Sequence, residues 1–222
     1  MIFDRLAPYY DQFIDPDLNL EYVNLLQKHC PEGTVIDLGC GTGPLSVDLA
    51  KLGYFVTGTD ISTNMLERAN HNAVLAGVRI NFFVHNILEP LNQTYDGIIM
   101  SSDVINYLNT EEDVQTAFTH VASAMTKDSI FLFDFIHIQY IERIHNYKQD
   151  ILLEDDVLQW SVRKTNKPHQ IEHRLTFGRE TESHVQTTFP LKTYRKLLND
   201  AGLMITKKKR TDERVIVVAK RK

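Results

Sequence analysis

One short segment constrains the fold of this chain more than any other. The apolar run Val35-Ile36 passes through Asp37 into three glycines at alternate positions, Gly39, Gly41 and Gly43. Glycine tolerates left-handed backbone conformations, and its missing side chain lets a ligand lie directly against the main chain. A plain structural turn does not need three alternating glycines. The pattern therefore predicts a buried parallel strand that ends in a ligand-binding backbone loop.

Two acidic residues are expected beside this loop. Asp37 ends the first strand, and Asp60 ends the next apolar run, which begins at Tyr54. Ligands of open α/β sheets bind at the carboxyl ends of the strands, where both carboxylates would lie. Two carboxylates suit a cationic amine and a sugar diol, and they would repel a pyrophosphate. S-adenosylmethionine has an amine and a ribose but no phosphate, so it is the predicted ligand.

A dinucleotide site is the alternative interpretation of the loop. Its pattern is G-x-G-x-x-G, and the third glycine allows close packing of helix and strand. Here Pro44 occupies that third position. Proline is instead favoured as the first residue of a helix, where its missing N–H costs nothing. Pro44 and Asp37 therefore argue against a nicotinamide oxidoreductase.

At these residues the chain resembles the class I S-adenosylmethionine-dependent methyltransferases. The resemblance is carried by Asp37, the three glycines and Asp60, and then by Tyr95-Asp96, which open the apolar run Gly97–Met100. It extends from the first helix to the last two strands. It is greatest to small bacterial members that have an N-terminal Tyr-Asp helix lidding the cofactor and a strand-rich insert.

The fold class expected from this pattern is α/β. Strands and helices alternate up to residue 136, which is typical of parallel layers. Three strand-like runs then follow without a helix, at Val157–Thr165, Gln170–Phe177 and Ser183–Phe189. They predict a small antiparallel sheet with one covered face. The resemblance implies a doubly wound, mostly parallel seven-stranded sheet, the Rossmann-like methyltransferase fold, with its last two strands antiparallel at one edge.

The chain is expected to divide into three parts. Residues 1–136 hold the N-terminal lid helices and the cofactor-binding α/β core, and residues 137–189 form the antiparallel β insert, a substrate cover or dimer contact. Residues 190–222 form a helix and a hairpin that complete the core sheet. Within the first part, the spacing of Ile2, Leu6, Tyr9, Tyr10 and Phe13 predicts a helix. Asn64 and Glu67 are expected to cap a later helix as a pair.

The resemblance also implies roles for individual residues toward S-adenosylmethionine. Asp37 would bond the amino group and Asp60 the ribose hydroxyls. Asn86 stands where the family usually has an aspartate, and its side-chain carbonyl can still accept one bond from the adenine amine. Met65 is equally well explained as helix core, Tyr10 as part of an aromatic core face and Asn86 as a turn residue. The full set of expected cofactor residues is Tyr10, Asp37, Gly39, Cys40, Gly41, Gly43, Asp60, Ile61, Met65, Asn86, Ile87 and Ser101.

The sequence says less about the residues that would contact the methyl acceptor. Asp103 and Tyr107, after the fourth strand, and His137, after the fifth, are the candidate catalytic residues. The alternative role of Asp103 is to cap a short helix. His173 and His184 of the insert could also face the acceptor, although a structural histidine is the commoner case. A base is needed only if the acceptor must lose a proton.

The amino-acid composition limits the kinds of molecule and membrane with which the chain is expected to interact. The net charge of −5 gives no global attraction to nucleic acid or acidic membranes, although Lys207–Arg210 and the C-terminus are locally basic. Neither the two cysteines nor the nine histidines show metal-ligand spacing, so no metal is expected. No signal peptide or long apolar run appears, which predicts a cytoplasmic protein, either a monomer or a homodimer.

The function expected from the sequence is methyl transfer from S-adenosylmethionine to N, O or C of a small molecule. The alternatives are an RNA or protein methyltransferase and a non-catalytic protein that binds S-adenosylmethionine or serves as a scaffold. An N-P-P-Y type motif is absent, and Ser101–Val104 stands in its place. The absence of this motif makes a nucleic-acid acceptor less favoured.

Overall fold

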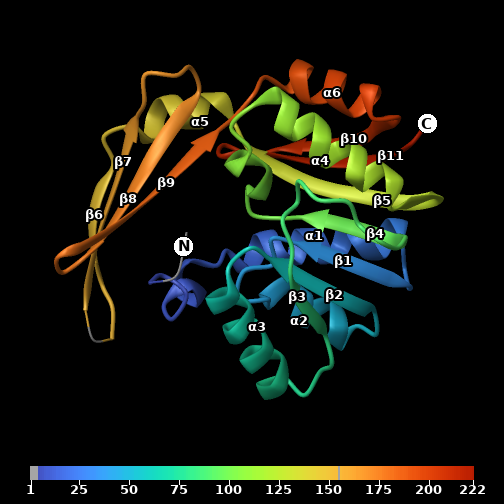
Figure 1. The fold of residues 1–222 in the computed structure, drawn as a ribbon, viewed down its shortest axis with the longest axis horizontal. Coiled ribbons are helices and arrows are strands. Elements are labelled where there is room, and N and C mark those ends of the chain that lie inside the picture. Colours follow the sequence, from blue (N-terminus) through green and yellow to red (C-terminus); the bar gives the residue numbers. More distant parts are fainter. Residues whose placement is uncertain (1–4, 155) are drawn as a thin grey trace.

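The computed structural model describes residues 5–154 and 156–222. Its main feature is a seven-stranded sheet with the strand order β10-β11-β5-β4-β1-β2-β3 (Figure 1). The strands of this sheet are β1 (Thr34–Leu38), β2 (Phe55–Asp60), β3 (Asn81–Val84), β4 (Tyr95–Met100), β5 (Met125–Ile136), β10 (Leu203–Arg210) and β11 (Arg214–Arg221).

The directions of the strands confirm the predicted, mostly parallel sheet. Strands β1 to β5 pair in parallel, with β1 between β2 and β4. The last strand, β11, lies antiparallel between β5 and β10. Because β10 is antiparallel to β11, it runs in the same direction as β5. The last two strands thus form the expected antiparallel hairpin at one edge of the sheet, and β11 is the strand that runs against the others.

Helices cover both faces of this sheet. Side chains of α1 (Pro16–His29) and α2 (Pro44–Lys51) pack on one face, and α3 (Thr63–Leu75) lies beside α2 against β2 and β3. Side chains of α4 (Glu111–Ser123) and α6 (Leu191–Asp200) pack on the other face. Buried side chains of each central strand point alternately to the two faces, as period-two geometry requires. None of the described helices combines the length and the apolar character needed to cross a membrane.

Local sequence signals explain where the helices begin. Gly43 precedes α2 in the left-handed conformation and Pro44 is its first residue, as predicted. Thr110 caps α4 through a bond from Asp113 N, and three acids follow in the first turn. The capping pair predicted for α3 is wrong, because Ser62 is the N-cap and accepts from Met65 N. A serine hydroxyl at this position satisfies an N–H that the helix itself cannot.

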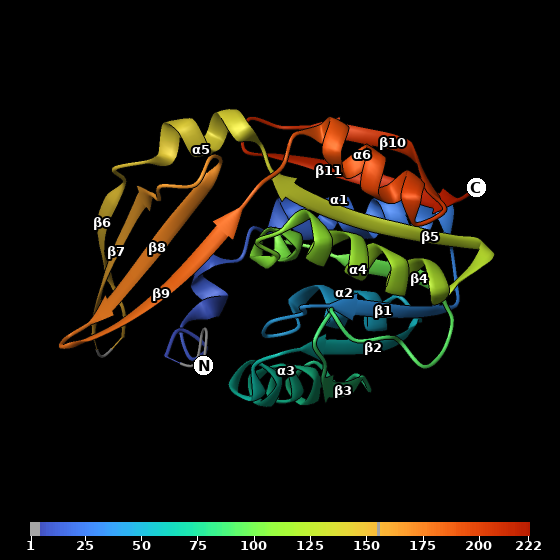
Figure 2. The same ribbon diagram turned by 45° about the horizontal axis from the view of Figure 1, so that its top comes forward.

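A second, antiparallel sheet lies beyond the carboxyl end of β5 (Figure 2). Its strands are β6 (Lys148–Leu152), β7 (Val157–Lys164), β8 (Gln170–Phe177) and β9 (Glu180–Thr187), and the helix α5 (Ile138–Ile144) precedes them. The predicted strands correspond to β7, β8 and β9, although β9 lies three residues earlier at its start than expected. Neither β6 nor α5 was predicted. We call residues 137–189 the insert and the rest of the described chain the core.

The insert leaves the core and returns to it at one place. Thr188 Oγ1 donates to Ile136 O at 2.7 Å, and Asn106 Oδ1 accepts from Ile136 N at 2.9 Å. Asn106 Nδ2 in turn donates to Thr187 O at 2.9 Å. Both ends of the insert are therefore fastened to the loop that follows β4.

The N-terminal segment, residues 5–15, lies between the insert and the core (Figures 1 and 2). Tyr9 stacks on Phe177 of β8 with ring centroids 6.3 Å apart, and Phe13 meets Trp160 of β7 edge-on. The predicted N-terminal helix is wrong for the described part, where turns lead into a single 3₁₀ turn, Tyr10–Phe13. The remaining residue of that prediction, Ile2, lies outside the described residues.

Candidate functional site

The glycine loop joins β1 to α2 and is held against the end of β2. Gly39 N and Cys40 N both donate to Thr59 O, at 2.7 and 2.8 Å. Gly39, Gly41 and Gly43 all have positive φ, from 55° to 79°. A Cβ added at Gly39 would lie 2.5 Å from Val104 Cγ2. Glycine is therefore required here both by the backbone conformation and by close packing.

Asp37 lies beneath this loop and is completely buried. Its Oδ2 accepts a hydrogen bond from Ser46 Oγ of α2 at 2.7 Å. Its Oδ1 is also buried and accepts from none of the described residues. Burial raises the pKa of Asp37 to about 6, although the Ser46 bond acts in the opposite direction. A buried carboxylate oxygen without a donor is costly, and a ligand amine would satisfy it.

Asp60 stands at the end of β2, on the other side of the loop. Its Oδ2 accepts from Gly41 N and its Oδ1 from Ser62 N, both at 2.9 Å. Burial raises the pKa of Asp60, while these backbone bonds partly offset that effect. The two backbone donors fix the orientation of the carboxylate. Each oxygen keeps lone-pair capacity for a further donor such as a ribose hydroxyl.

The N-terminal segment closes over the glycine loop. Asp11 Oδ1 accepts from Thr42 Oγ1 at 2.6 Å, and Asn72 Nδ2 of α3 donates to Thr42 O at 3.1 Å. A Cβ on Gly41 would lie 3.4 Å from the ring of Tyr10. Burial raises the pKa of Tyr10, and the charges of Asp103 and Asp60 raise it further. The Tyr10 ring thus packs over the loop, within electrostatic reach of both acids.

The residues expected around adenine and the methionyl chain differ in exposure. Ile61 is 52% exposed and Met65 is only 1% exposed, so Met65 lies in the packing of α3. Asn86 Oδ1 accepts from Leu88 N at 3.0 Å, which is the local turn bond considered as its alternative role. Ile87 is partly buried against the core, and Ser101 is buried at the end of β4.

Cys40 lies in the loop as a buried side chain. Burial raises the pKa of its thiol well above the ordinary value, and the charges of Asp37 and Asp60 act in the same direction. The thiolate is the reactive form of cysteine. The Cys40 side chain is therefore a small packing group and is poorly suited to act as a nucleophile.

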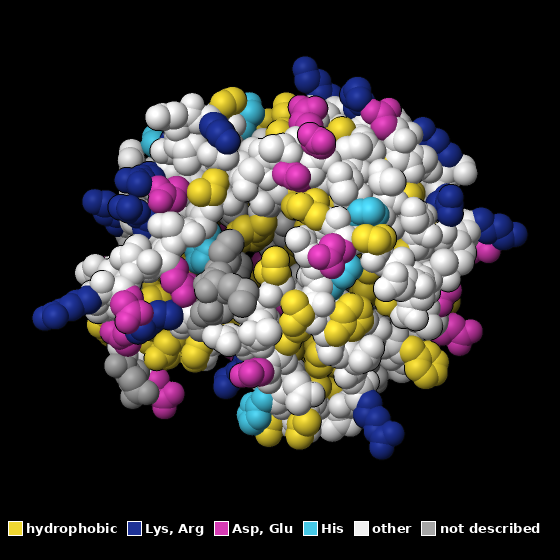
Figure 3. Space-filling view, viewed as in Figure 1, with side chains coloured by type: hydrophobic (Ala, Val, Ile, Leu, Met, Phe, Trp, Pro, Cys, Tyr) yellow, Lys and Arg dark blue, Asp and Glu magenta, His cyan; other side chains and the backbone are white. Residues whose placement is uncertain are grey.

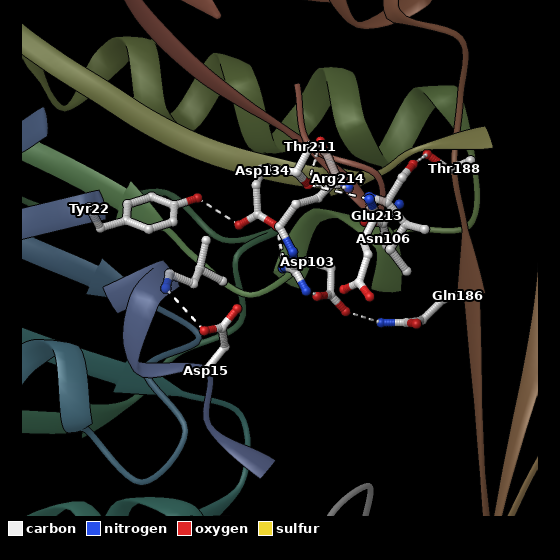
Figure 4. Close-up of polar contacts among 12 residues, drawn as sticks. Asp15, Tyr22, Asp103, Asn106, Asp134, Gln186, Thr188, Thr211, Glu213 and Arg214 are labelled. Atoms are coloured by element: carbon white, nitrogen blue, oxygen red, sulfur yellow. Dashed lines mark hydrogen bonds and ion pairs between the residues drawn. The ribbon is translucent and has the colours of Figure 1, made fainter. Parts of the chain in front are cut away.

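The acid that follows β4 belongs to a buried polar network (Figure 4). Asp103 Oδ1 lies 3.0 Å from Arg214 Nη1 of β11, and its Oδ2 accepts from Gln186 Nε2 of β9 at 2.6 Å. Asp103 occupies the N-cap position of the 3₁₀ turn Val104–Tyr107 with φ of 57°, but its side chain caps nothing. The carboxylate instead connects the core to the insert.

The network continues on the α1 side of the sheet. Arg214 Nη1 also lies 2.7 Å from Asp134 Oδ2 of β5, and Tyr22 OH of α1 donates to Asp134 Oδ1 at 2.6 Å. Burial raises the pKa of both Asp103 and Asp134, and the Arg214 charge opposes this. The buried carboxylate of Asp134 and the half-buried carboxylate of Asp103 therefore share one guanidinium. Sequence reasoning missed Asp134 and Arg214, although an acid inside the apolar run Ile130–Ile136 indicates a buried partner.

Tyr107 lies on the same side of the glycine loop as Asp103. Burial raises its pKa well above the ordinary value, and the charges of Asp103 and Asp60 add to that rise. A hydrogen bond with Gln186 acts in the opposite direction. Asp103 and Tyr107 of the core and Gln186 of the insert therefore form one polar group.

The inner face of the insert adds a buried polar wall. His173 and His184 are opposed residues on β8 and β9, and Gln186 is 3% exposed beside them. Trp160 Nε1 donates to His173 Nδ1 at 3.1 Å. Burial lowers the pKa of His173 and of His184 to about 4. Both rings are thus neutral at physiological pH and can donate or accept hydrogen bonds without charge.

The third catalytic candidate, His137, lies elsewhere. It is the N-cap of α5, where its Nδ1 accepts from Gln139 N at 3.2 Å. Its ring lines a cavity whose other walls come from β5, α5, the β9–α6 connection, α6, β10 and β11, and which includes no glycine-loop residue. The structure therefore does not bring His137 together with the glycine loop. Within the described part of the chain, no group of three His, Cys, Asp or Glu side chains is placed to hold a metal ion.

These features together fit S-adenosylmethionine. The fit rests on three observations, namely the buried Asp37 Oδ1 that lacks a donor, the oriented Asp60 carboxylate and the side-chain-free surface of the loop. A ligand amine, a ribose diol and close main-chain contact are the complements of these features.

Comparison with known proteins agrees with this assignment. A family model described as a methyltransferase domain matches residues 35–128. The chain is 30% identical to the "Putative methyltransferase" of Geobacillus sp. (strain WCH70), over 100% of both chains. An S-adenosylmethionine-dependent methyltransferase from Clostridium acetobutylicum ATCC 824 has the same fold, with a TM-score of 0.84, 18% identity and 98% coverage of both chains. The amino pentose methyltransferase from Micromonospora echinaspora, solved with S-adenosylmethionine bound, has a TM-score of 0.77, 18% identity and coverage of 98% and 96%.

Proposed function

The chain belongs to the class I S-adenosylmethionine-dependent methyltransferases, and from that premise we propose that it methylates a small molecule held between the core and the insert. One observation carries the proposal. The inner face of the insert presents buried polar side chains to the side of the glycine loop where Asp103 and Tyr107 lie.

In this proposal, the loop residues hold the cofactor. Asp37 Oδ1 accepts the amino group, Asp60 accepts the ribose hydroxyls, and the backbone of Gly39 to Gly41 packs against the methionyl and ribose parts. Ile61 and Ile87 flank the adenine, and Tyr10 covers the loop. The cofactor supplies a methyl group that is already activated on a cationic sulfur, so the protein has no bond to activate on that side.

The residues of the chain would then orient the acceptor and exclude water. Proximity and orientation supply roughly 7–11 kcal/mol of barrier reduction in favourable cases. Asp103 is held by Arg214 and Gln186, so its carboxylate is a fixed acceptor for an acceptor N–H or O–H. Because burial raises its pKa, Asp103 also becomes a better base than an exposed aspartate.

Two observations favour a small acceptor over a macromolecule. The site is covered by the N-terminal segment as well as by the insert. Basic side chains on the face shown in Figure 3 project from its edges and do not form a continuous patch. The amino pentose methyltransferase with the same fold is named for a small-molecule acceptor, which is consistent with this choice.

An RNA acceptor is the second candidate, and the observation in its favour is the basic strand β10. Lys209 of that strand pairs with Glu21 of α1 at 2.8 Å, which reduces its availability to phosphates. The neighbouring Lys207 and Lys208 are exposed. Binding to RNA would weaken steeply with salt, whereas methylation of a small acceptor would not show that slope.

The first test is calorimetric titration with S-adenosylhomocysteine, followed by a methyl-transfer screen of small amines, alcohols and acids. We expect Asp60→Ala to weaken binding by about 1.5–3 kcal/mol, the range for hydrogen bonds to charged groups. Asp48→Ala, at an exposed position of α2, is the matched control. Binding without turnover of any small acceptor, together with methylation of RNA, would support the second candidate. Binding without any turnover would support a non-catalytic role.

The proposal also covers the oligomeric state of the protein and its location in the cell. A monomer or homodimer in the cytoplasm remains our prediction, and the free thiols of Cys30 and Cys40 suit a reducing compartment. Sedimentation velocity and fractionation would test the two statements separately.

A further inference from the structure

A cavity of about 340 Å³ lies between α5, the start of α6 and the β10–β11 hairpin, on the face of the sheet that α4 and α6 cover. Figure 2 shows the tip of this hairpin beside the start of α5. The volume falls within the range of small-molecule sites. No residue of the glycine loop and no member of the Arg214 network lines it. It is therefore separate from the cofactor site.

The interior of this cavity is apolar. Its lining includes Phe135 of β5 and Val215 of β11, both almost fully buried, together with partly exposed side chains from α5, the β9–α6 connection and α6. The partly exposed members are Ile138, Phe189 and Leu191. A ring or a branched aliphatic group would bury its surface against these side chains.

Two cations form one wall. Lys208 and Arg210 are two residues apart on β10, so they point to the same face, opposite Val217 and Val215 in the strand pairing. Arg210 Nη2 donates to Gln139 Oε1 of α5 at 2.6 Å, which holds the guanidinium over the cavity. A guanidinium held in this way retains further N–H donors in a planar fork that matches a carboxylate or phosphate.

Among the described residues that line the cavity, none is acidic, and the remaining polar group is His137. Burial lowers the pKa of His137, and the charges of Arg210 and Arg143 lower it further. The surroundings of the ring are thus electropositive. Like charges gathered beside an apolar surface become favourable when an anion is bound between them.

We propose that this cavity binds a compact organic anion, a carboxylate or phosphate carried on a ring or branched apolar body. The anionic group lies between Lys208 and Arg210, and the apolar body lies on Phe135, Leu191 and Val215. The proposal does not depend on the methyl acceptor or on turnover.

The test is a titration of the ¹⁵N-labelled protein by NMR with phenylphosphate and benzoate as probes. We expect saturable binding, with amide shifts at Ile138, Phe189 and Leu191. Inorganic phosphate lacks the apolar body and benzyl alcohol lacks the charge, so each should bind at least about tenfold more weakly than its parent probe. Either phenylphosphate or benzoate binding alone would identify the preferred anion and would support the proposal.

A matched pair of double variants tests the assignment of the wall. K208A/R210A should weaken probe binding by at least about tenfold, as expected for loss of charge-assisted hydrogen bonds. K207A/K209A removes the same charge from the opposite face of the same strand and should change binding less than twofold. The spectrum of each variant shows directly whether it is folded. Three outcomes would overturn the proposal. The first is that neither probe binds saturably, and the second is that the amide shifts centre on the glycine loop or on a contact with a second protein molecule. The third is that both double variants weaken binding equally.

Discussion

Gln186 of the insert donates a hydrogen bond to Asp103 of the core at 2.6 Å, so an insert side chain orients an acid of the core (Figure 4). The same carboxylate is held from the core side by Arg214 at 3.0 Å. Two elements that are far apart in the sequence thus fix one carboxylate between them. The position of Asp103 depends on the insert being docked.

The buried network makes a strong prediction for Arg214→Met. The substitution leaves the buried Asp134 and the half-buried Asp103 without their cation, and breaking a buried pair such as that of Asp134 costs about 3–5 kcal/mol. The free energy of unfolding in urea at pH 7.5 measures the loss. Both acids would then titrate with still higher pKa in the folded state, so the folded protein binds more protons. The deficit should therefore shrink as the pH is lowered toward 5.

Arg163→Met is the matched control for that variant. Arg163 pairs with Glu172 at 2.6 Å on the surface of the insert, where its side chain is 56% exposed. Exposed ion pairs contribute less than about 1 kcal/mol. Equal losses in the two variants would contradict the stabilising role given to the buried network.

The cofactor affinity should depend on pH through Asp37. Burial raises the pKa of Asp37 to about 6, and an amino group is bound best by the ionised carboxylate. Affinity for S-adenosylhomocysteine should therefore fall as the pH drops below about 6, by up to about tenfold per pH unit, and should be level above pH 7. Asp37→Asn should bind more weakly and lose this dependence. A wild-type affinity that does not change between pH 5 and 7 would remove Asp37 from the amine site.

The effect of Asp37 on stability has the opposite sign. Its pKa in the folded, ligand-free protein is raised above the ordinary value near 3.8, so the folded state binds more protons between about pH 4 and pH 6. Its contribution to stability is therefore lost as the pH rises through that window. Comparing urea unfolding with and without S-adenosylhomocysteine separates the two effects.

Substitution of Gly39 by alanine should be costly for two reasons. Its φ of 76° disfavours any side chain, and the added Cβ would lie 2.5 Å from Val104 Cγ2. Gly53 offers a matched control, because its φ is 94° but no atom lies within 4 Å of an added Cβ. Gly53→Ala should lose roughly 1 kcal/mol through backbone strain alone. Gly39→Ala should lose about 1–3 kcal/mol more, together with cofactor binding, in urea unfolding and calorimetry.

Acid should disrupt the inner face of the insert before the rest of the protein. Trp160, the one tryptophan of the chain, donates to His173 Nδ1, and protonation of that nitrogen abolishes the bond. Burial lowers the pKa of His173 from 6.5 to about 4. Tryptophan fluorescence should therefore change with a midpoint near pH 4, ahead of the loss of helical circular dichroism. Because the unfolded chain binds more protons between pH 4 and 6.5, stability should fall as the pH falls through that window.

His71→Gln is the control, since His71 is exposed on α3. Its fluorescence titration should match that of the wild type, whereas His173→Phe should remove the transition. A transition that survives in His173→Phe would contradict the assignment of His173 as the titrating group.

The core could be predicted from sequence because its signals are local. An apolar run followed by alternating glycines predicts a strand and its loop without reference to the rest of the chain. The same holds for Pro44 at the start of α2 and for Thr110 with its following acids at the start of α4. Where two local signals competed, the prediction failed. Ser62 caps α3, although Asn64 and Glu67 have the spacing of a capping pair.

The insert was harder to predict from sequence because the elements that were missed, β6 and α5, have weak hydrophobic patterns. Strand β6 has no buried side chain along its five residues, and α5 has one, Ile141. The N-cap of α5 is His137, and histidine is not among the favoured N-cap residues. The N-terminal segment has helical spacing, but its aromatic rings pack on the insert and on the glycine loop. Tertiary contacts override a short helical pattern of this kind.

The sequence predicted Asp103 and Tyr107 on the acceptor side, but not the buried network that holds Asp103. Tyr22, Asp103, Asp134 and Arg214 lie far apart along the chain, and only the folded sheet brings them together. The acid within the apolar strand β5 was the one local indication. Its partners depend on β11 lying beside β5, which is a property of strand order.

The bond between Thr188 and Ile136 has a consequence for how such an enzyme diversifies. The chain departs from the core and rejoins it at neighbouring residues, so the intervening segment can be exchanged, shortened or enlarged without altering the path of either flanking element. Insertions at such closely spaced ends are tolerated well by folded domains. Selection can thus remodel the insert while the glycine loop and its two acids stay unchanged. A chimera that carries a foreign segment between Ile136 and Thr188 would inherit this separation.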